Sequence, residues 1–293
     1  MQLDKARVLP IIKAALKEDI GTGDVTTAAL INKSASIDTV MLTREDCVVC
    51  GLQIAEWTMG AADYSVRFRP NCSDGDIAPA WKELAYIEGR GQSILKAERV
   101  MINFVAFLSG IATKTRKFVD IAKPYGVNIM DTRKTIPLMR YLEKYAVLTG
   151  GGCNHRMGLY DGVLIKDNHI RVSGIWHRGP ESGEKLRLKD LIEKARKNNV
   201  RGIKIEVEVE NLEEFSDALS GKPDIIMLDN MSPDNVKACL DIRRLSKIKS
   251  LLEVSGGITL DTVEKYAKTK VDMISVGSLT DAVQGIDMTL DIV

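Results

Sequence analysis

The stretch IKIEVEVENLEEFSDALSGKPDIIMLDN, residues 203–230, holds the pattern that decides the fold. A strand-like segment that alternates apolar and charged residues opens it, a helical stretch follows, and an apolar segment ends in Asp229 and Asn230. Parallel strands look like this in sequence, because the chain returns to a parallel sheet through a crossover that is usually a helix. The stretch therefore predicts one β/α unit of a parallel sheet.

The same pattern recurs from about Ile111 onward. The expected strands span residues 127–130, 162–165, 203–209, 225–228, 251–254 and 273–276. Nearly every one is followed by polar residues or glycine. Because the active site of a β/α barrel gathers at the C-terminal ends of its strands, we expect these ends to form one site.

Residues whose type suggests chemistry lie at the strand ends and in the loop before the second expected strand. They are Asp131, Arg133, Lys134, His155, Arg156, Lys166, Asp167, Asp229, Asn230, Ser255, Gly256, Gly257, Gly277 and Ser278. Cationic groups gather between Asp131 and His169, although the whole chain has 41 Lys+Arg against 40 Asp+Glu and a net charge of +1. A local cluster in a near-neutral chain predicts a small anionic ligand rather than nucleic acid, which favours strongly basic domains.

The first strand of the opening stretch alternates apolar residues with Lys204, Glu206, Glu208 and Glu210. Strands of a parallel barrel are usually apolar on both faces, so a charged face needs a reason. Either that face points into the mouth of the barrel, where a carboxylate can meet a hydroxyl, a metal or a cation, or the strand is an edge strand with a solvated face. Alternation alone favours the edge strand, and the context of the strand must decide between the two.

Small residues follow the last two expected strands, in SGGI at 255–258 and VGS at 276–278. Barrels often bind phosphate in the loops after their final strands, where backbone N–H groups approach the anion closely. Glycine also fits plain tight turns. Two such ends in the expected order favour the phosphate site.

Composition sets the class of protein. With 293 residues and 45% hydrophobic content, the chain is expected to fold around one large core or two unequal ones. It has no apolar run of about 20 residues and no secretory signal, so we expect a cytosolic protein. Five irregularly spaced cysteines argue against a disulfide framework. The lone CxxC of Cys47 and Cys50 is expected to be structural rather than a redox or zinc site.

The first hundred residues indicate a mixed α+β unit. A helix is expected at 6–17, an alternating strand at 65–70 and a second helix at 94–109. Met101, Val105 and Leu108 make one apolar face of that second helix, and Arg99 falls away from its centre.

Several motifs together carry a specific resemblance to a known family. They are EDIGTGDVTT at 18–27, AERVMINFVAFLSGIAT at 97–113, MDTRKTIP at 130–137, LEKYAV at 142–147, GGGCNHRMGLYDGVLIKDNHI at 150–170, EVEVEN at 206–211, MLDN at 227–230, EVSGGI at 253–258 and VGSLT at 276–280. The chain resembles the quinolinate phosphoribosyltransferases, which are type II phosphoribosyltransferases, over nearly its whole length. The resemblance implies transfer of phosphoribose from phosphoribosyl pyrophosphate to quinolinate with decarboxylation, giving nicotinate mononucleotide for NAD biosynthesis.

The same resemblance implies a role for each matching residue. The quinolinate carboxylates are implied to bind to Arg133, Lys134, His155 and Arg156. The pyrophosphate is implied to contact Lys166, and the ribose hydroxyls and the magnesium-bound donor are implied to contact Glu208 and Asp229. The 5-phosphate is implied to bind at Ser255, Gly256, Gly257 and Gly277. Lys134, Lys166, Glu208 and Asp229 are the implied catalytic residues, and Glu208 and Asp229 hold Mg²⁺ directly or through water or substrate. Arg99 is implied to reach the acceptor site of a neighbouring subunit, so a homodimer is expected, with further assembly left open.

The resemblance also implies the architecture. An N-terminal α+β domain, residues 1–111, is completed by residues 279–293, and residues 112–278 form an open, incomplete β/α barrel. The sequence departs from the family's pattern at Ile136, beside the acceptor site, and in residues 173–185, which resemble an inserted loop and suggest a lid. Two alternatives remain: a related member with another acceptor, such as the molybdenum-operon homologue, and a non-catalytic sugar-phosphate-binding barrel.

Overall fold

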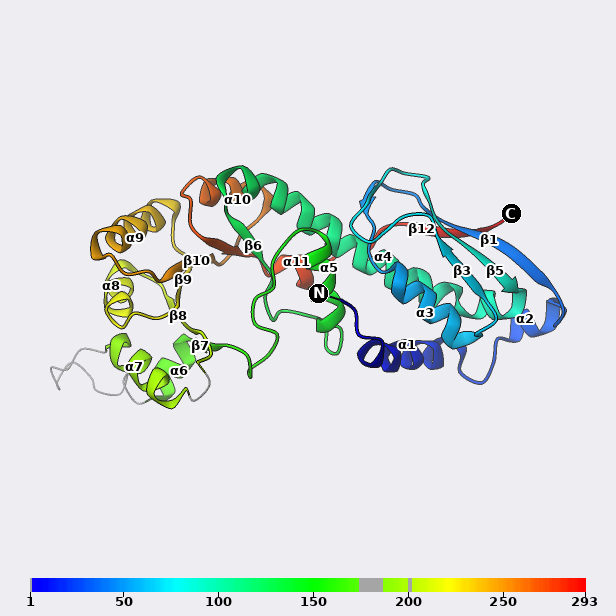
Figure 1. The fold of residues 1–293 in the computed structure, drawn as a ribbon, viewed down its shortest axis with the longest axis horizontal. Coiled ribbons are helices and arrows are strands. Elements are labelled where there is room, and N and C mark those ends of the chain that lie inside the picture. Colours follow the sequence, from blue (N-terminus) through cyan, green and yellow to red (C-terminus); the bar gives the residue numbers. More distant parts are fainter. Residues whose placement is uncertain (1, 174–186, 200–201) are drawn as a thin grey trace. The chain divides into compact units, whose positions relative to one another are not determined.

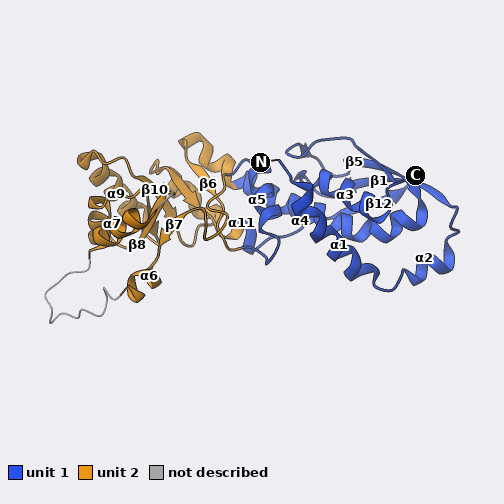
Figure 2. Cartoon of the chain, turned by 60° about the horizontal axis from the view of Figure 1, so that its bottom comes forward, with its two compact units in different colours: residues 1–117, 135–152, 279–293 blue, residues 118–134, 153–278 orange. Residues whose placement is uncertain are grey.

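A computed structural model of the protein describes residues 2–173, 187–199 and 202–293. The chain forms two compact units (Figure 2). The first comprises Met1–Lys117, Thr135–Gly152 and Leu279–Val293, and the second comprises Phe118–Lys134 and Cys153–Ser278. The lid hypothesis concerns residues 173–185, of which all but Ser173 lie outside the described residues.

The first unit is built on an antiparallel sheet. Its strand order is β12 (Met288–Ile292), β1 (Ser36–Thr43), β5 (Glu83–Arg90) and β3 (Arg67–Pro70), with a separate pair of β2 (Cys47–Val48) and β4 (Ile77–Ala78). The helices of this unit include α1 (Lys5–Ile20), α2 (Val25–Leu30), α3 (Leu52–Ala62), most of α4 (Gly91–Ala122) and α5 (Arg140–Thr149). Strand β12 pairs with β1 so that Thr39 lies opposite Ile292. The last strand of the chain is therefore an edge of the N-terminal sheet.

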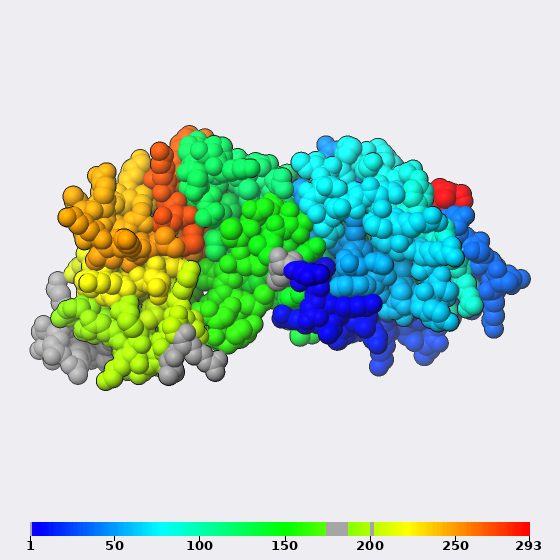
Figure 3. All heavy atoms as spheres, in the orientation of Figure 1, coloured from blue at the N-terminus to red at the C-terminus, as the bar shows by residue number. Residues whose placement is uncertain are grey.

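Helix α1 shows why the N-terminal segment folds as it does. Asp4 caps the helix, since its Oδ1 accepts a hydrogen bond from the backbone N–H of Ala6. Val8, Ile12 and Leu16 recur at helical spacing and are buried. The opposite face is exposed, and the dark-blue atoms of α1 are visible on the surface in Figure 3.

Helix α4 is longer than the sequence predicted, because it continues from Gly91 through Ile111 to Ala122. The apolar spacing also continues, since Ile111 and Phe118 are buried. Gly110 lies within the helix, and a Cβ there would overlap the backbone carbonyl oxygen of Gln284. A glycine at this position lets the C-terminal segment lie directly against α4.

The second unit is a parallel sheet covered by helices, as Figure 1 shows. The strand order is β6 (Asn128–Met130), β11 (Met273–Ser275), β10 (Leu251–Ser255), β9 (Ile225–Asp229), β8 (Ile205–Val209) and β7 (Val163–Ile165). The connecting helices are α6 (Asp167–Val172), α7 (Leu188–Asn198), α8 (Leu212–Ser220), α9 (Pro233–Ser246) and α10 (Leu260–Ala267), and a four-residue helix, α11 (Ser278–Asp281), follows β11. All the expected strands are present, and β6 and β7 remain at opposite ends of the sheet order. The predicted open α/β barrel is confirmed.

The position of β8 decides between the two interpretations of its charged residues. It pairs with β7 on one side and β9 on the other, so it is not an edge strand, and that interpretation was wrong. Glu206 is buried and Glu208 is half-buried. The charged face of the strand points into the barrel.

Among the residues that the structure describes, no helix combines the length and the apolar character that a membrane crossing requires. All five cysteines are free thiols. Burial raises the pKa of the Cys47 thiol, and it raises that of Cys50 further. Both therefore stay protonated at neutral pH, which suits a structural role better than metal binding or redox chemistry.

Candidate active site

The C-terminal ends of the six parallel strands surround one pocket of about 550 Å³ in the second unit. Its lining is made of Thr132, Arg133, Lys134, His155, Arg156, Leu164, Lys166, Glu208, Met227, Asp229, Asn230, Ser255, Gly256, Gly257, Ile258, Ser275 and Gly277. Every residue to which the family resemblance assigns a role is in this lining except Arg99. Of the other strand-end residues that the sequence singled out, Asn230 is in the lining, whereas Asp131, Asp167 and Ser278 are not. Arg99 is an exposed residue of α4 in the first unit.

The cationic part of the wall comes from two segments that meet beside β6. Arg133 and Lys134 follow this strand directly, and Cys153, shortly before His155 and Arg156, forms a parallel bridge with Met130. The Nη1 of Arg156 donates a hydrogen bond to the carbonyl oxygen of Gly162, at 2.9 Å. Desolvation lowers the pKa of Arg156, and the nearby charge of Arg133 lowers it further. A guanidinium remains protonated under such conditions, so the two arginines keep a concentrated positive charge that a bound anion would relieve.

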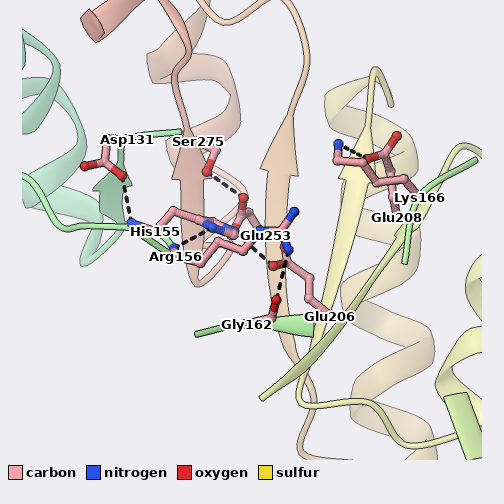
Figure 4. A network of polar contacts seen from close by, with 9 residues as sticks. All are labelled: Asp131, His155, Arg156, Gly162, Lys166, Glu206, Glu208, Glu253 and Ser275. Carbon is pink, nitrogen blue, oxygen red and sulfur yellow. Dashed lines mark hydrogen bonds and ion pairs between the residues drawn. The ribbon is translucent and has the colours of Figure 1, made fainter. Parts of the chain in front are cut away.

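The surroundings of His155 are more constrained than its sequence position suggested. Its backbone N–H donates to Asp131 Oδ1 at 2.8 Å, and Asp131 is fully buried. Its ring Nδ1 accepts a hydrogen bond from the backbone N–H of Arg156 at 2.8 Å. The other ring nitrogen, Nε2, lies 2.9 Å from Glu206 Oε2 (Figure 4). The protein thus engages both ring nitrogens, and direct binding of a substrate carboxylate by this ring stays a prediction.

Lys166 and Glu208 form an ion pair across the pocket wall, with 2.8 Å between Lys166 Nζ and Glu208 Oε2. Lys166 directly follows β7 and is the N-cap residue of α6, and its backbone N–H donates to His169 Nδ1 at 3.0 Å. His169 therefore holds the start of α6 in place beside Lys166. Strand β9, which pairs with β8, ends at Asp229, whose Oδ2 accepts a hydrogen bond from Asn230 Nδ2 at 2.7 Å.

The small residues after β10 and β11 form a tight concave end of the pocket. Gly256 and Gly257 have φ angles of +97° and +59°, which favour glycine. The backbone N–H of Asn230 donates to the carbonyl oxygen of Ser255 at 2.9 Å, which fixes the ends of β9 and β10 to each other. Gly277 completes this end after β11. Backbone groups can approach an anion closely here, since no side chain projects from the glycines.

Sequence reasoning missed several residues of the site and of the layer beneath it. Thr132 and Ser275 line the pocket, and Glu206 and Glu253 lie under its wall. Glu206 had a usable signal, because it is two residues before Glu208 and a strand places such residues on the same face. The sequence signal for Glu253 was weaker, because it is only a lone carboxylate within an otherwise apolar strand.

The described residues also include a group whose atoms suit a metal ion by distance. The candidate ligand atoms of His155, Glu206 and Glu253 all lie within 4.8 Å of one another. The pair predicted to hold Mg²⁺ is different, since Glu208 and Asp229 face the open pocket. Their hard carboxylate oxygens fit a cation that also takes oxygens from a substrate phosphate.

Comparisons with family profiles and with individual relatives give one consistent result. The profile of the quinolinate phosphoribosyl transferase C-terminal domain matches residues 111–291, and that of the N-terminal domain matches residues 24–109. A protein of Methanocaldococcus jannaschii, named "Probable nicotinate-nucleotide pyrophosphorylase [carboxylating]", is 40% identical over 295 residues, covering 99% of this chain and 98% of its own. The Arabidopsis thaliana protein named "Nicotinate-nucleotide pyrophosphorylase [carboxylating], chloroplastic" is 38% identical over 295 residues, covering 96% of this chain and 82% of its own.

The fold agrees as well. The solved structure of the nicotinate-nucleotide pyrophosphorylase from Francisella tularensis superposes with a TM-score of 0.90 at 37% identity, covering 100% of this chain and 98% of that one. Both domain profiles, full-length relatives and a full-length structural match lead to the same conclusion: this chain belongs to the quinolinate phosphoribosyltransferase family.

Proposed function

We propose that this protein transfers the 5-phosphoribosyl group of phosphoribosyl pyrophosphate to the ring nitrogen of quinolinate and removes the ring 2-carboxylate as carbon dioxide. The products are nicotinate mononucleotide, pyrophosphate and carbon dioxide, and the pathway is NAD biosynthesis. The observation that carries the proposal is the single pocket that gathers cations, carboxylates and glycine-rich strand ends. The free thiols fit a reducing compartment, which we take to be the cytosol.

The two ends of the pocket suit the two substrates. Quinolinate carries two carboxylates, which the planar guanidinium groups of Arg133 and Arg156 can bind with paired hydrogen bonds, while Lys134 adds a point charge. The glycine-rich end at Ser255 and Gly256 takes the 5-phosphate through backbone N–H groups. The ribose and pyrophosphate of the donor then extend from this glycine-rich end toward the cationic end that binds quinolinate.

The chemistry asks mainly for positioning and electrostatic stabilisation. The bond from ribose C1 to the pyrophosphate oxygen breaks, pyrophosphate leaves with the electron pair, and the pyridine nitrogen forms the new bond to C1. Glu208 and Asp229 stabilise the positive charge that develops on the ribose, and Lys166 stabilises the leaving group. The bond from ring C2 to its carboxylate then breaks, carbon dioxide leaves, and the electron pair left at C2 takes up a proton.

Glu208 and Asp229 are also the residues that would hold Mg²⁺, directly or through water and substrate oxygens. When bound, the ion neutralises part of the pyrophosphate charge. Glu208 is also paired with Lys166, so a bound ion would share this carboxylate with the lysine, or the lysine would turn toward the pyrophosphate.

The direct test of this function is an assay of products. Purified protein with quinolinate, phosphoribosyl pyrophosphate and Mg²⁺ is expected to release carbon dioxide and nicotinate mononucleotide in equal amounts. Nicotinate in place of quinolinate is the control acceptor, and it is expected to give far less product, because it lacks the second carboxylate. A folded protein that forms neither product contradicts the proposal.

We also propose that the working unit is a homodimer in which Arg99 of one protomer reaches the acceptor site of its partner. Arg99 supports this by its position, since it is an exposed cation on α4 and is not part of the pocket lining of the second unit. If Arg99 of one protomer binds the acceptor in its partner's pocket, each active site contains residues of both protomers.

Mixing two inactive variants tests the shared site. Arg99→Ala and Lys166→Ala damage different chains' contributions, so a mixed dimer keeps one intact site. After dissociation and random reassociation, activity is expected to return to about a quarter of the wild-type value, since half of the dimers are mixed and each has one good site. Each variant reassociated with itself is the control. Failure of the mixture to regain activity would place Arg99 outside the partner's site.

A further inference from the structure

Two buried carboxyl groups lie directly beneath the cationic wall of the pocket. Glu206 on β8 is 4% exposed and Glu253 on β10 is 0% exposed, and neither belongs to the pocket lining. Their side chains point toward His155 from two different strands (Figure 4). The proposed function gives neither residue a role, although burying two carboxyl groups is costly unless they are paired or neutralised.

The surroundings of Glu253 show how this cost is reduced. Ser275 Oγ donates a hydrogen bond to Glu253 Oε1, and His155 Nε2 lies 3.7 Å from Glu253 Oε2. Within the described part of the chain, Oε2 accepts no hydrogen bond. Two further acids, Glu206 and Asp131, act on it electrostatically. An oxygen without a donor, in an acidic and fully buried position, suits a carboxyl group that carries its own proton.

The electrostatics agree with this geometry. Burial raises the pKa of Glu253 to about 8, and the nearby Glu206 raises it too, while His155 and the Ser275 hydroxyl act in the opposite direction. At neutral pH the carboxyl is therefore mostly uncharged. As pH rises through about 8, it becomes a carboxylate.

We propose that Glu253 is a positioning residue for the acceptor end of the pocket and that it works in its uncharged form. It acts through Ser275 and His155, both of which line the pocket. The inference rests on the proposed function, because the property that Glu253 affects is the binding of a dianionic acceptor.

The uncharged form of Glu253 matters because its charge would change the electrostatic potential at the acceptor end of the pocket. Arg133 and Arg156 attract the two carboxylates of quinolinate, and a new negative charge directly behind His155 opposes this attraction through a medium that screens charges poorly. A neutral carboxyl keeps its hydrogen bond to Ser275 and its contact with His155 without that penalty. Ionisation of Glu253 therefore weakens acceptor binding while the donor end of the pocket is less affected.

The pH profile of the wild type and of Glu253→Gln tests the idea. In the wild type, kcat/KM for quinolinate is expected to fall above pH 8, approaching about tenfold per pH unit. In Glu253→Gln, which cannot ionise, the ratio of kcat/KM at pH 9 to that at pH 7 is expected to be close to one. The dependence on pH is expected in the KM for quinolinate rather than in the KM for phosphoribosyl pyrophosphate. A variant that keeps the full wild-type decline overturns the proposal.

A second variant keeps the proposal testable if Glu253→Gln does not fold. Ser275→Ala removes the hydrogen bond that favours the charged form of Glu253, so the decline is expected to move to higher pH. Glu264→Gln, at an exposed carboxylate of α10 that pairs with Lys268, is the matched control and should keep the wild-type decline. A decline that stays in place in Ser275→Ala, or a stoichiometric metal ion in the purified protein, overturns the proposal.

A stability measurement separates this inference from the proposed function, because it needs no turnover. The folded-state pKa of Glu253 lies above its ordinary value of 4.5, so its contribution to stability is fully present below pH 4.5 and is lost as pH rises through about 8. The Tm of the wild type is expected to fall relative to that of Glu253→Gln between pH 6 and pH 9. If the two proteins keep a constant difference in Tm, Glu253 is not the titrating group. Absence of quinolinate turnover in a wild type that shows the Tm effect contradicts only the proposed function.

Discussion

Lys166→Ala is expected to lower kcat/KM for phosphoribosyl pyrophosphate by about 10²–10³-fold, which is the usual loss when one preorganised group that stabilises developing charge is removed. Lys166 lies at the end of β7, in the pocket wall, and its Nζ is 2.8 Å from Glu208 Oε2. Pyrophosphate gains negative charge as it leaves, and an ammonium group fixed beside it lowers that barrier. The alanine variant also leaves Glu208 as an unbalanced negative charge facing an anionic substrate.

Steady-state kinetics with both substrates separate these effects. The KM for quinolinate should change much less than kcat, because the proposed function assigns acceptor binding mainly to Arg133 and Arg156. Lys268→Ala is a matched control, since Lys268 also forms an ion pair with a glutamate, Glu264, at 3.0 Å, but on the exposed surface of α10. It is expected to keep wild-type kinetics. If Lys166→Ala retains kcat/KM within about twofold of the wild type, the role given to Lys166 is incorrect.

Gly256→Ala is expected to destabilise the protein by about 2–6 kcal/mol, as the sum of backbone strain and overpacking. Gly256 has a φ of +97°, and a Cβ there would overlap Asn230 Oδ1 and lie 2.8 Å from the backbone nitrogen of Asn230. Asn230 cannot easily retreat, because its backbone N–H is bonded to the Ser255 carbonyl oxygen. The substitution therefore forces apart the ends of β9 and β10, where the 5-phosphate is expected to bind.

The adjacent glycine provides the control. Gly257 has a φ of +59°, but a Cβ at this position would have no heavy atom within 4 Å. Gly257→Ala is therefore expected to cost only about 1–2 kcal/mol of backbone strain. Urea denaturation gives both free energies of unfolding, and the KM for phosphoribosyl pyrophosphate reports on the site. Equal losses of stability in the two variants would mean that the contact with Asn230 does not matter.

The sequence predicted the second unit well because its signals are local. Each strand is a short apolar run followed by polar residues or glycine, and the parallel arrangement brings those ends together whatever the helices between them do. The pocket residues from Arg133 to Gly277 followed from that rule together with the family motifs. The direction of the charged face of β8 was harder, because alternation does not show whether a strand has one neighbour or two.

Features that depend on contacts between distant segments were not predictable in this way. Helix α4 continues to Ala122 because residues beyond Ile111 are also buried, and the partners that bury them are far away in the sequence. The segment Thr135–Gly152 belongs to the first unit although it follows the first strand of the second. Glu253 is recognisable as part of the site only when β8, β10 and β11 place Glu206 and Ser275 around it.

The pairing of β12 with β1 has a consequence for the order of assembly during synthesis. Thr39 and its partner Ile292 lie far apart in the sequence, so this edge of the first sheet stays unpaired until β12 has left the ribosome. The parallel sheet from β6 to β11 needs no residue beyond Ser275 and can form earlier. The unit that begins first in the sequence is therefore the one completed last.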